Sequence, residues 1–218
     1  MHVTCGRCLK PPVYWAPTCF AHIPEAEREK WTADVLHDVF YFGGIGVPFP
    51  ECDFSGRDFK KANLSRSNLK GANLRGADLR ETVFLEADLV GADLTEANLL
   101  KANFSETKLD GAKFARSKLE RCNLEGADAK GADFSGADLR HAVLHGVHAQ
   151  GANFAGADLS DATLSQTDLT GADFSGCRLA RADFTGADLV GANFAGASGL
   201  DLTIADETTR GRELLAPK

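Results

Sequence analysis

The chain has 218 residues, is 44% apolar and carries a formal net charge of −7. That length and apolar content provide a buried core and exclude a disordered tail, while the absence of a basic patch excludes a typical nucleic-acid-binding surface. No apolar run approaches the roughly 20 residues of a membrane helix and no signal-peptide pattern opens the chain, so we expect a soluble, cytoplasmic protein that contacts neither membranes nor DNA directly.

The first segment, residues 1–23, contains two close pairs of soft metal ligands separated by a short loop. Thiolate and imidazole groups in this arrangement can close a tetrahedral Zn²⁺ site, and a short loop costs little entropy to shut. The sequence therefore predicts a structural zinc knuckle, with His2 as a substitute ligand. A redox Cys-x-x-Cys pair and unligated thiols are the alternatives. The predicted ligands are Cys5, Cys8, Cys19 and His22.

The second segment, residues 24–51, reads as an amphipathic helix followed by a linker. Pro24 suits a first helical turn, and Trp31, Val35 and Val39 fall on one face of a helix from Ile23 to Phe40. We expect this helix to cap whatever structure follows it, with a dimerisation helix as the alternative. The glycine run from 43 to 46 lacks a phosphate-binding lysine and is read as the linker.

The third segment, residues 52–197, has a five-residue repeat. From Phe54 to Phe194 every fifth residue is Leu or Phe, except at Ala129 and Ala149. A small residue stands two before each centre, Asp or Asn stands just before it, and Gly often stands two after. A period of five fits neither an α-helix nor a β-strand, so the chain must turn once per repeat.

Units such as A-D-L-R-E at residues 77–81 and A-D-F-S-G at residues 132–136 make the chain resemble the pentapeptide-repeat family. The resemblance implies an all-β fold, a right-handed quadrilateral parallel β-helix in which four repeats form one square coil. Twenty residues per coil then give about seven coils and a rod on the order of 35 Å long. The helix of residues 24–51 would cap its first end, and residues 198–218 would form a C-terminal cap and polar tail.

Stacking at intervals of 20 residues predicts which side chains share a side of the core. One side alternates little and is mostly aromatic, whereas Ala129 and Ala149 leave two successive coils without a large residue on another side. This gap is either a packing defect that the backbone relaxes or a dent that a partner recognises. The predicted core column is Phe54, Leu74, Leu94, Phe114, Phe134, Phe154, Phe174 and Phe194.

The outward positions carry an uneven charge pattern. Lys108, Lys113 and Lys118 replace Asp or Asn in three successive repeats and predict a basic collar at mid-length. Beyond it the outward positions are acidic. Ordinary solubility and partner binding both explain such charge. The predicted partner-binding residues are Lys108, Lys113, Lys118, Asp158, Asp168, Asp173, Asp183 and Asp188.

These features favour a non-catalytic protein-interaction scaffold or adaptor. The repeat explains the acidic residues at corners, no nucleophile stands out, and a filled interior leaves no cleft for a substrate. The family resemblance also implies an alternative, because some bacterial members imitate DNA and protect DNA gyrase from quinolones or toxins. The balanced charge of residues 52–140 argues against such imitation. Whether the protein is a monomer or a dimer stays open.

Overall fold

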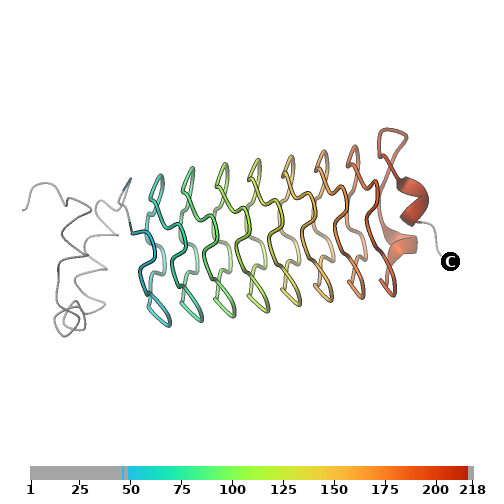
Figure 1. Cartoon of the computed structure of the whole chain (residues 1–218). Coiled ribbons are helices and arrows are strands. Elements are labelled where there is room, and N and C mark those ends of the chain that lie inside the picture. The colour runs from blue at the N-terminus through green and yellow to red at the C-terminus, as the bar shows by residue number, and fades with distance from the viewer. Residues whose placement is uncertain (1–45, 47–48, 216–218) are drawn as a thin grey trace, which may run out of the picture.

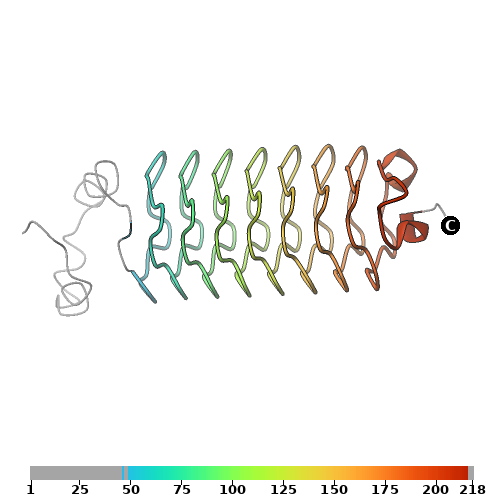
Figure 2. The same cartoon turned by 90° about the horizontal axis from the view of Figure 1, so that it is seen from above.

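The computed structural model describes residue 46 and residues 49–215, which form a straight solenoid (Figures 1 and 2). Isolated parallel bridges join residues 20 apart, beginning with Asp53 and Asn73, so successive coils lie side by side. Four bridged residues follow one another at five-residue intervals within a coil, which gives the coil four sides. The predicted β-solenoid is confirmed. The predicted zinc ligands at 5, 8, 19 and 22 and the predicted helix of 23–40 lie outside the described residues.

We number the sides in chain order by the first core residue that each contributes to the predicted frame. Side 1 begins at Phe54, side 2 at Phe59, side 3 at Leu64 and side 4 at Leu69, and each continues every 20 residues. Phe49 extends side 4 one coil upstream, since it is buried and its N–H donates to the Asn68 carbonyl. We call the outward residue just before each core residue the rung residue, because it forms the bridges.

The five-residue repeat supplies an acceptor for each of its backbone donors. In the repeat centred on Leu74, the N–H groups of Asn73, Leu74 and Gly76 donate to carbonyls of neighbouring coils, and the Ala77 N–H donates back to the Leu74 carbonyl at the corner. The remaining N–H, of Arg75, donates to Oδ1 of Asn73 at 3.2 Å. Buried or half-buried backbone donors need partners, so Asp or Asn at the rung position is a requirement of the turn.

Each corner holds one residue in the left-handed conformation, two positions after the core residue. Glycine adopts it without steric cost, as at Gly151 with φ of 64°, but Glu81 also adopts it with φ of 58°. Non-glycine corner residues therefore carry backbone strain, and they also carry the outermost side chains of the rod. Most of the exposed ion pairs between coils start from these corners.

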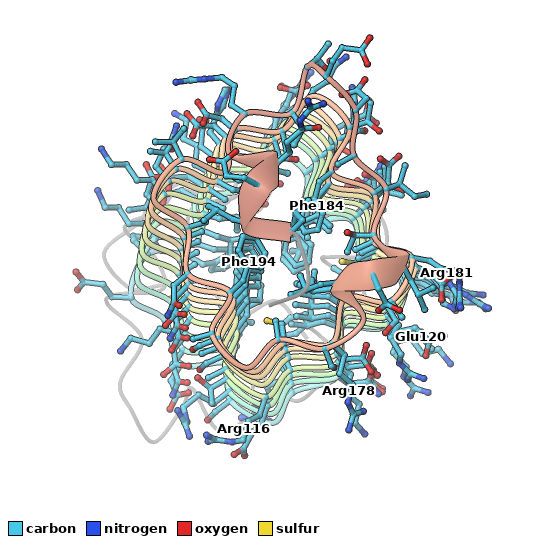
Figure 3. The ribbon with its side chains drawn as sticks, turned by 90° about the vertical axis from the view of Figure 1, so that its right-hand side faces the viewer. Arg116, Glu120, Arg178, Arg181, Phe184 and Phe194 are labelled. Atoms are coloured by element: carbon cyan, nitrogen blue, oxygen red, sulfur yellow. The ribbon has the colours of Figure 1, made fainter. Side chains whose placement is uncertain are left out.

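The interior is a set of stacked apolar columns. On side 1 the rings of Phe114, Phe134, Phe154, Phe174 and Phe194 stack at centroid spacings of 4.8 to 5.0 Å, close to the spacing of neighbouring β-strands. Viewed from the C-terminal end, the Phe184 and Phe194 rings point inward while Arg116, Arg178 and Arg181 point outward (Figure 3). Of the predicted core column, seven residues are buried and Phe194 at the end is half-buried.

The gap at Ala129 and Ala149 does not disturb the backbone ladder. Both residues are fully buried, and their N–H groups donate to the carbonyls of His148 and Asp168 at 2.8 Å, as in neighbouring coils. Val147, in the small position, is also buried. The described backbone therefore passes the gap in register, and the bridges on side 4 are uninterrupted there.

The last coil breaks the frame at Gly199 and then resumes it. Gly199 has φ of 77° and precedes the 3₁₀ helix η1, Leu200–Leu202, so the expectation that Leu200, Leu202 and Ile204 alternate in a strand is wrong. The left-handed glycine turns the chain and the Leu202 N–H bonds back to its carbonyl, which starts a helical turn instead. Ile204 still bridges Asp183 and Arg210 bridges Asp188, 21 and 22 residues apart.

A second 3₁₀ helix, η2, Arg212–Leu215, covers part of the C-terminal end of the core. Leu215 is buried and Leu214 packs against the core. Within the part of the chain that the structure describes, no helix is long and apolar enough to cross a membrane.

Candidate interaction surfaces

The chemistry that a partner can reach lies in the rung, post-core and corner residues, because the core columns are buried. The predicted lysine collar takes the geometry expected of it. Lys108 lies on side 4, Lys113 on side 1 and Lys118 on side 2, each bridged to the coils on both sides, and all three are exposed. Among the described residues, none of the three forms an ion pair with a carboxylate. The collar charge is therefore available to a partner.

The collar lysines remove turn hydrogen bonds from their own coil. An ammonium group has no acceptor, so Lys113 cannot bind the N–H of Ala115 as Asn73 binds that of Arg75. The same holds for Lys108 and Lys118. Losing such a turn bond costs roughly 0.5–1.5 kcal/mol each, so this coil is less stable than an Asp or Asn sequence would make it.

The arginines beside the collar are neutralised within the rod. Arg116 binds Glu96 in the preceding coil, with its Nη2 2.9 Å from the carboxylate. Arg121 lies 3.7 Å from Glu120. The expected basic strip is therefore narrower than the sequence suggests, because the lysines carry the free charge and the arginines do not.

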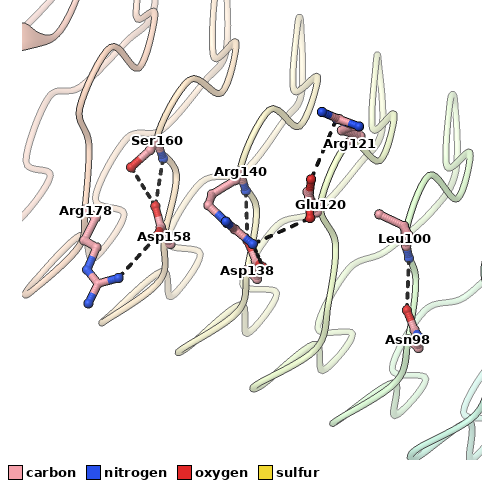
Figure 4. Close-up of polar contacts among 9 residues, drawn as sticks. All are labelled: Asn98, Leu100, Glu120, Arg121, Asp138, Arg140, Asp158, Ser160 and Arg178. Carbon is pink, nitrogen blue, oxygen red and sulfur yellow. Dashed lines mark hydrogen bonds and ion pairs between the residues drawn. The ribbon is translucent and has the colours of Figure 1, made fainter.

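Side 2 carries a ladder of charged contacts in the second half of the rod (Figure 4). Arg140 binds both carboxylate oxygens of Asp138, at 2.7 and 2.6 Å, and lies 3.5 Å from Glu120 in the coil before. Arg178 approaches Asp158 at 3.5 Å. Glycines 136, 156 and 176 leave the neighbouring corner without side chains, which opens a shallow polar groove of about 450 Å³ along these pairs. The groove has cations and anions in alternation, so it offers no net charge to a partner.

The five predicted acidic residues do not form one patch. Asp173 lies on side 1, Asp158 on side 2 and Asp183 on side 3, whereas Asp168 and Asp188 are neighbours on side 4. Asp158 pairs with Arg178 and Asp188 with Arg210. Each of the five also accepts the N–H two residues later, so their first role is in the turns.

Hydrogen bonds in these turns favour the ionised aspartates. The backbone N–H and hydroxyl of Ser175 hold the pKa of Asp173 below its ordinary value. Arg140 does the same for Asp138, against the opposing effect of burial. At Asp168 partial burial acts to raise the pKa, but the bonds from Thr170 and Gln150 outweigh it and the net pKa is lowered. These carboxylates are poor proton donors or acceptors at neutral pH.

The buried thiols have structural roles. Burial raises the pKa of Cys122, and raises that of Cys177 to about 12, so both remain protonated. The Cys177 thiol donates to the Phe154 carbonyl at 2.8 Å, in the manner of Thr107 to Phe84. A protonated, buried thiol is not a nucleophile.

The sequence interpretation missed the ion pairs that join corners of neighbouring coils. Arg66 pairs with Glu86, Glu96 with Arg116 and Asp161 with Arg181, each 20 residues apart. A search for opposite charges at spacing 20 within the frame finds all of them. Exposed pairs of this kind contribute about 0–1 kcal/mol each, so they matter chiefly because they remove arginines from the surface available for binding.

Comparisons with known proteins agree with this architecture. A model of the pentapeptide repeat region matches residues 117–194, and a model of pentapeptide repeats in eight copies matches residues 49–85, 72–111 and 87–126. None of the curated proteins matches the chain.

Solved structures of similar proteins share the solenoid. Full-length QnrB1, a plasmid-mediated fluoroquinolone resistance protein, is 22% identical with a TM-score of 0.51, and the match covers 75% of this chain and 93% of that chain. HetL, involved in heterocyst differentiation regulation in the cyanobacterium Nostoc, is 25% identical with a TM-score of 0.30, over 76% and 87%. The matched repeats span 49–194, about two thirds of the chain, with a right-handed β-helix as their fold. The chain belongs to the pentapeptide repeat family.

Proposed function

We propose that the protein is a non-catalytic interaction scaffold, a rigid rod that binds a protein partner through its outer surface. The lysine collar is the observation that carries this proposal. Lys108, Lys113 and Lys118 face outward from three sides of one coil without carboxylate partners among the described residues, although each replaces a residue type that would stabilise its turn. A costly, unpaired positive charge suits an acidic surface on a partner.

The absence of catalysis is part of the proposal and is supported by the same geometry. The core is filled, the described thiols of Cys122 and Cys177 are protonated, and the aspartates of the turns are ionised and occupied. Such groups serve the fold, and the rod then acts by position and charge.

A modulator of DNA gyrase that imitates DNA is the second candidate, favoured by the likeness of the fold to QnrB1, a fluoroquinolone resistance protein. Imitation of DNA requires continuous lines of negative charge, since duplex DNA carries one charge per roughly 1.7 Å. The collar interrupts the rung columns of sides 1, 2 and 4, and arginines pair with acids on side 2. We therefore place this function second.

The test compares the protein with a variant that has Lys108→Asn, Lys113→Asn and Lys118→Asn. Asparagine restores the turn acceptor, so we expect equal or higher thermal stability together with loss of the partner that co-purifies from the native cell. A control with Lys60→Ser, Lys70→Ser and Lys130→Ser removes the same charge from post-core positions and should keep the partner. Equal recovery of the partner with all three proteins would contradict the collar assignment.

A supercoiling assay separates the two candidates. We expect purified gyrase to be unaffected by micromolar protein, with or without a quinolone. Inhibition or protection of gyrase that the collar variant retains would favour the second candidate instead.

A further inference from the structure

Side 3 differs from the other sides in the charge of its rung column. Over six coils the column contains no charged residue, whereas sides 1, 2 and 4 each combine aspartates with a lysine. Protein interfaces are depleted of charge at their centre, so side 3 is the side best suited to close contact with another protein. The column is Asn63, Val83, Asn103, Asn123, Val143 and Thr163.

The two valines of this column are exposed without a role in the turns. Val143 is 37% exposed and Val83 is half-buried, and neither supplies the acceptor that Asn103 gives to the N–H of Ser105. On side 1 the amide nitrogen of Asn73 donates to Asp53 in the same column. Side 3 has no carboxylate in these six rungs, so its asparagine amide nitrogens face outward as donors.

The order of the column is nearly the same when it is read from either end. Counted from the middle, asparagine stands at 103 and 123, valine at 83 and 143, and a small polar residue at 63 and 163. A two-fold axis that crosses the rod at mid-height brings each rung residue opposite its mirror position. Such an axis relates two copies of the chain in antiparallel orientation, as closed dimers require.

We propose that side 3 binds side 3 of a second copy of this chain, antiparallel, with Val83 against Val143 of the second copy. Two valine contacts then flank a central pair of asparagine contacts between positions 103 and 123. Asparagine side chains can both donate and accept, so the centre can be satisfied without charge.

The corner residues on one edge of side 3 match this arrangement. Lys61 comes opposite Asp161 of the second copy, and Glu81 comes opposite His141. Within one chain Lys61 already pairs with Glu81, and Asp161 pairs with Arg181. The dimer extends these two ion pairs into one network with alternating charge. Lys101 and Arg121 are the one like-charged pair on this edge.

The corner residues on the other edge match by size. Glu86 comes opposite Gly146 of the second copy and Glu106 opposite Gly126. Each long carboxylate side chain meets a corner that has no side chain, so neither clash nor repulsion between carboxylates arises. In a parallel arrangement every residue faces itself, and Glu86, Lys61 and Glu81 would each meet a like charge.

The contact area indicates a weak dimer. Six rungs span five coil spacings, about 24 Å, and one side of five residues is at most about 16 Å wide. Each copy thus buries roughly 400 Å², which is in the range of weak, reversible complexes. This inference goes beyond the proposed function, because the collar lysines lie on sides 1, 2 and 4 and stay free in the dimer.

The experiment is sedimentation of the full chain between about 1 and 500 µM, with charge-swap variants. Val83→Asp and Val143→Lys place residues that already occur at rung positions, so both variants should fold, as circular dichroism will check. We expect the wild type to dimerise at high concentration and each single variant to associate at least about tenfold more weakly. The double variant, and an equimolar mixture of the two single variants, should dimerise again, since Asp at 83 then faces Lys at 143.

Three results would overturn the proposal. The first is a wild type that stays monomeric up to 500 µM. The second is a dimer that both single variants leave intact, which would place the contact at another side or at an end of the rod. The third is loss of the dimer in the single variants without recovery in the double variant or in the mixture, which would exclude the antiparallel register.

Discussion

At the residue scale, the rung aspartate is best understood through the one backbone donor that no neighbouring coil can satisfy. Its side chain accepts the N–H two residues later, as Asp173 does from Ser175 at 2.9 Å. The five-residue pattern in the sequence was sufficient to predict a turn residue here. The sequence did not reveal that lysine at this position costs a hydrogen bond, because that requires knowing which N–H groups the coils leave over.

Acid should destabilise the rod through these turns. The folded pKa of Asp173 is lowered by bonds from Ser175, and that of Asp138 by Arg140. A lowered folded pKa adds stability that is present above the unfolded pKa, near 3.9, and is lost as the pH falls through the folded value. Thermal unfolding should thus be independent of pH above about 5 and shift to lower temperature below about 4.

The matched variant for the acid effect is Asp173→Asn, since Asn153 and Asn193 occupy the same column. It keeps the acceptor and removes the titration, so its melting temperature should fall less steeply below pH 4 than that of the wild type. An identical slope in both proteins would show that this carboxylate does not contribute.

Gly199 tests a single steric contact. A Cβ at this position would lie 2.7 Å from the Ala180 backbone nitrogen, and φ is 77°. Gly151 has φ of 64° but open space around it. Gly151→Ala should cost about 1 kcal/mol from the left-handed backbone alone, and Gly199→Ala about 1–3 kcal/mol more. Urea unfolding measures both, and equal costs would contradict the close approach.

At the element scale, the ends of the solenoid were harder to predict than its middle. Every core residue from 54 to 194 follows a fixed spacing, so the sequence defines the coils. After Gly199 the chain inserts one residue and then a second, and Ile204 and Arg210 resume the ladder without any leucine or phenylalanine at the expected spacing. The bonds of Thr209, whose hydroxyl donates to the Phe184 carbonyl, are visible only in three dimensions.

The helix η2 should protect the last coil more than the rest. Leu215 is buried and Leu214 is half-buried at the end of the core. Because a solenoid is stabilised mainly between neighbouring coils, Leu215→Ser should speed hydrogen exchange at the N–H groups of residues 204 and 210 and leave residue 103 unchanged. Leu214→Ser is the control with a smaller effect. Uniform acceleration along the rod would contradict a local cap.

At the scale of the whole molecule, the fold separates stability from recognition. Core and turn residues determine that a rod forms, and the outer columns determine what it can bind. The sequence predicted the lysine collar at 108, 113 and 118, since register alone places it. It did not predict that the five acidic residues divide among four sides with two of them paired to arginine, because pairing depends on which corners meet. The self-complementary order of side 3 likewise becomes meaningful only once that column is known to be a surface.

The claim that apolar residues face inward while their direct neighbours face outward can be measured with one thiol-labelling experiment. Cys177 is buried, and the next residue, Arg178, has a side chain 74% exposed. In an Arg178→Cys variant under native conditions, we expect a maleimide to label position 178 within minutes and to leave position 177 unlabelled until the protein unfolds, as mass spectrometry of the peptides will show. Equal labelling of the two adjacent positions would contradict the square coil and, with it, the assignment of function to the outer surface.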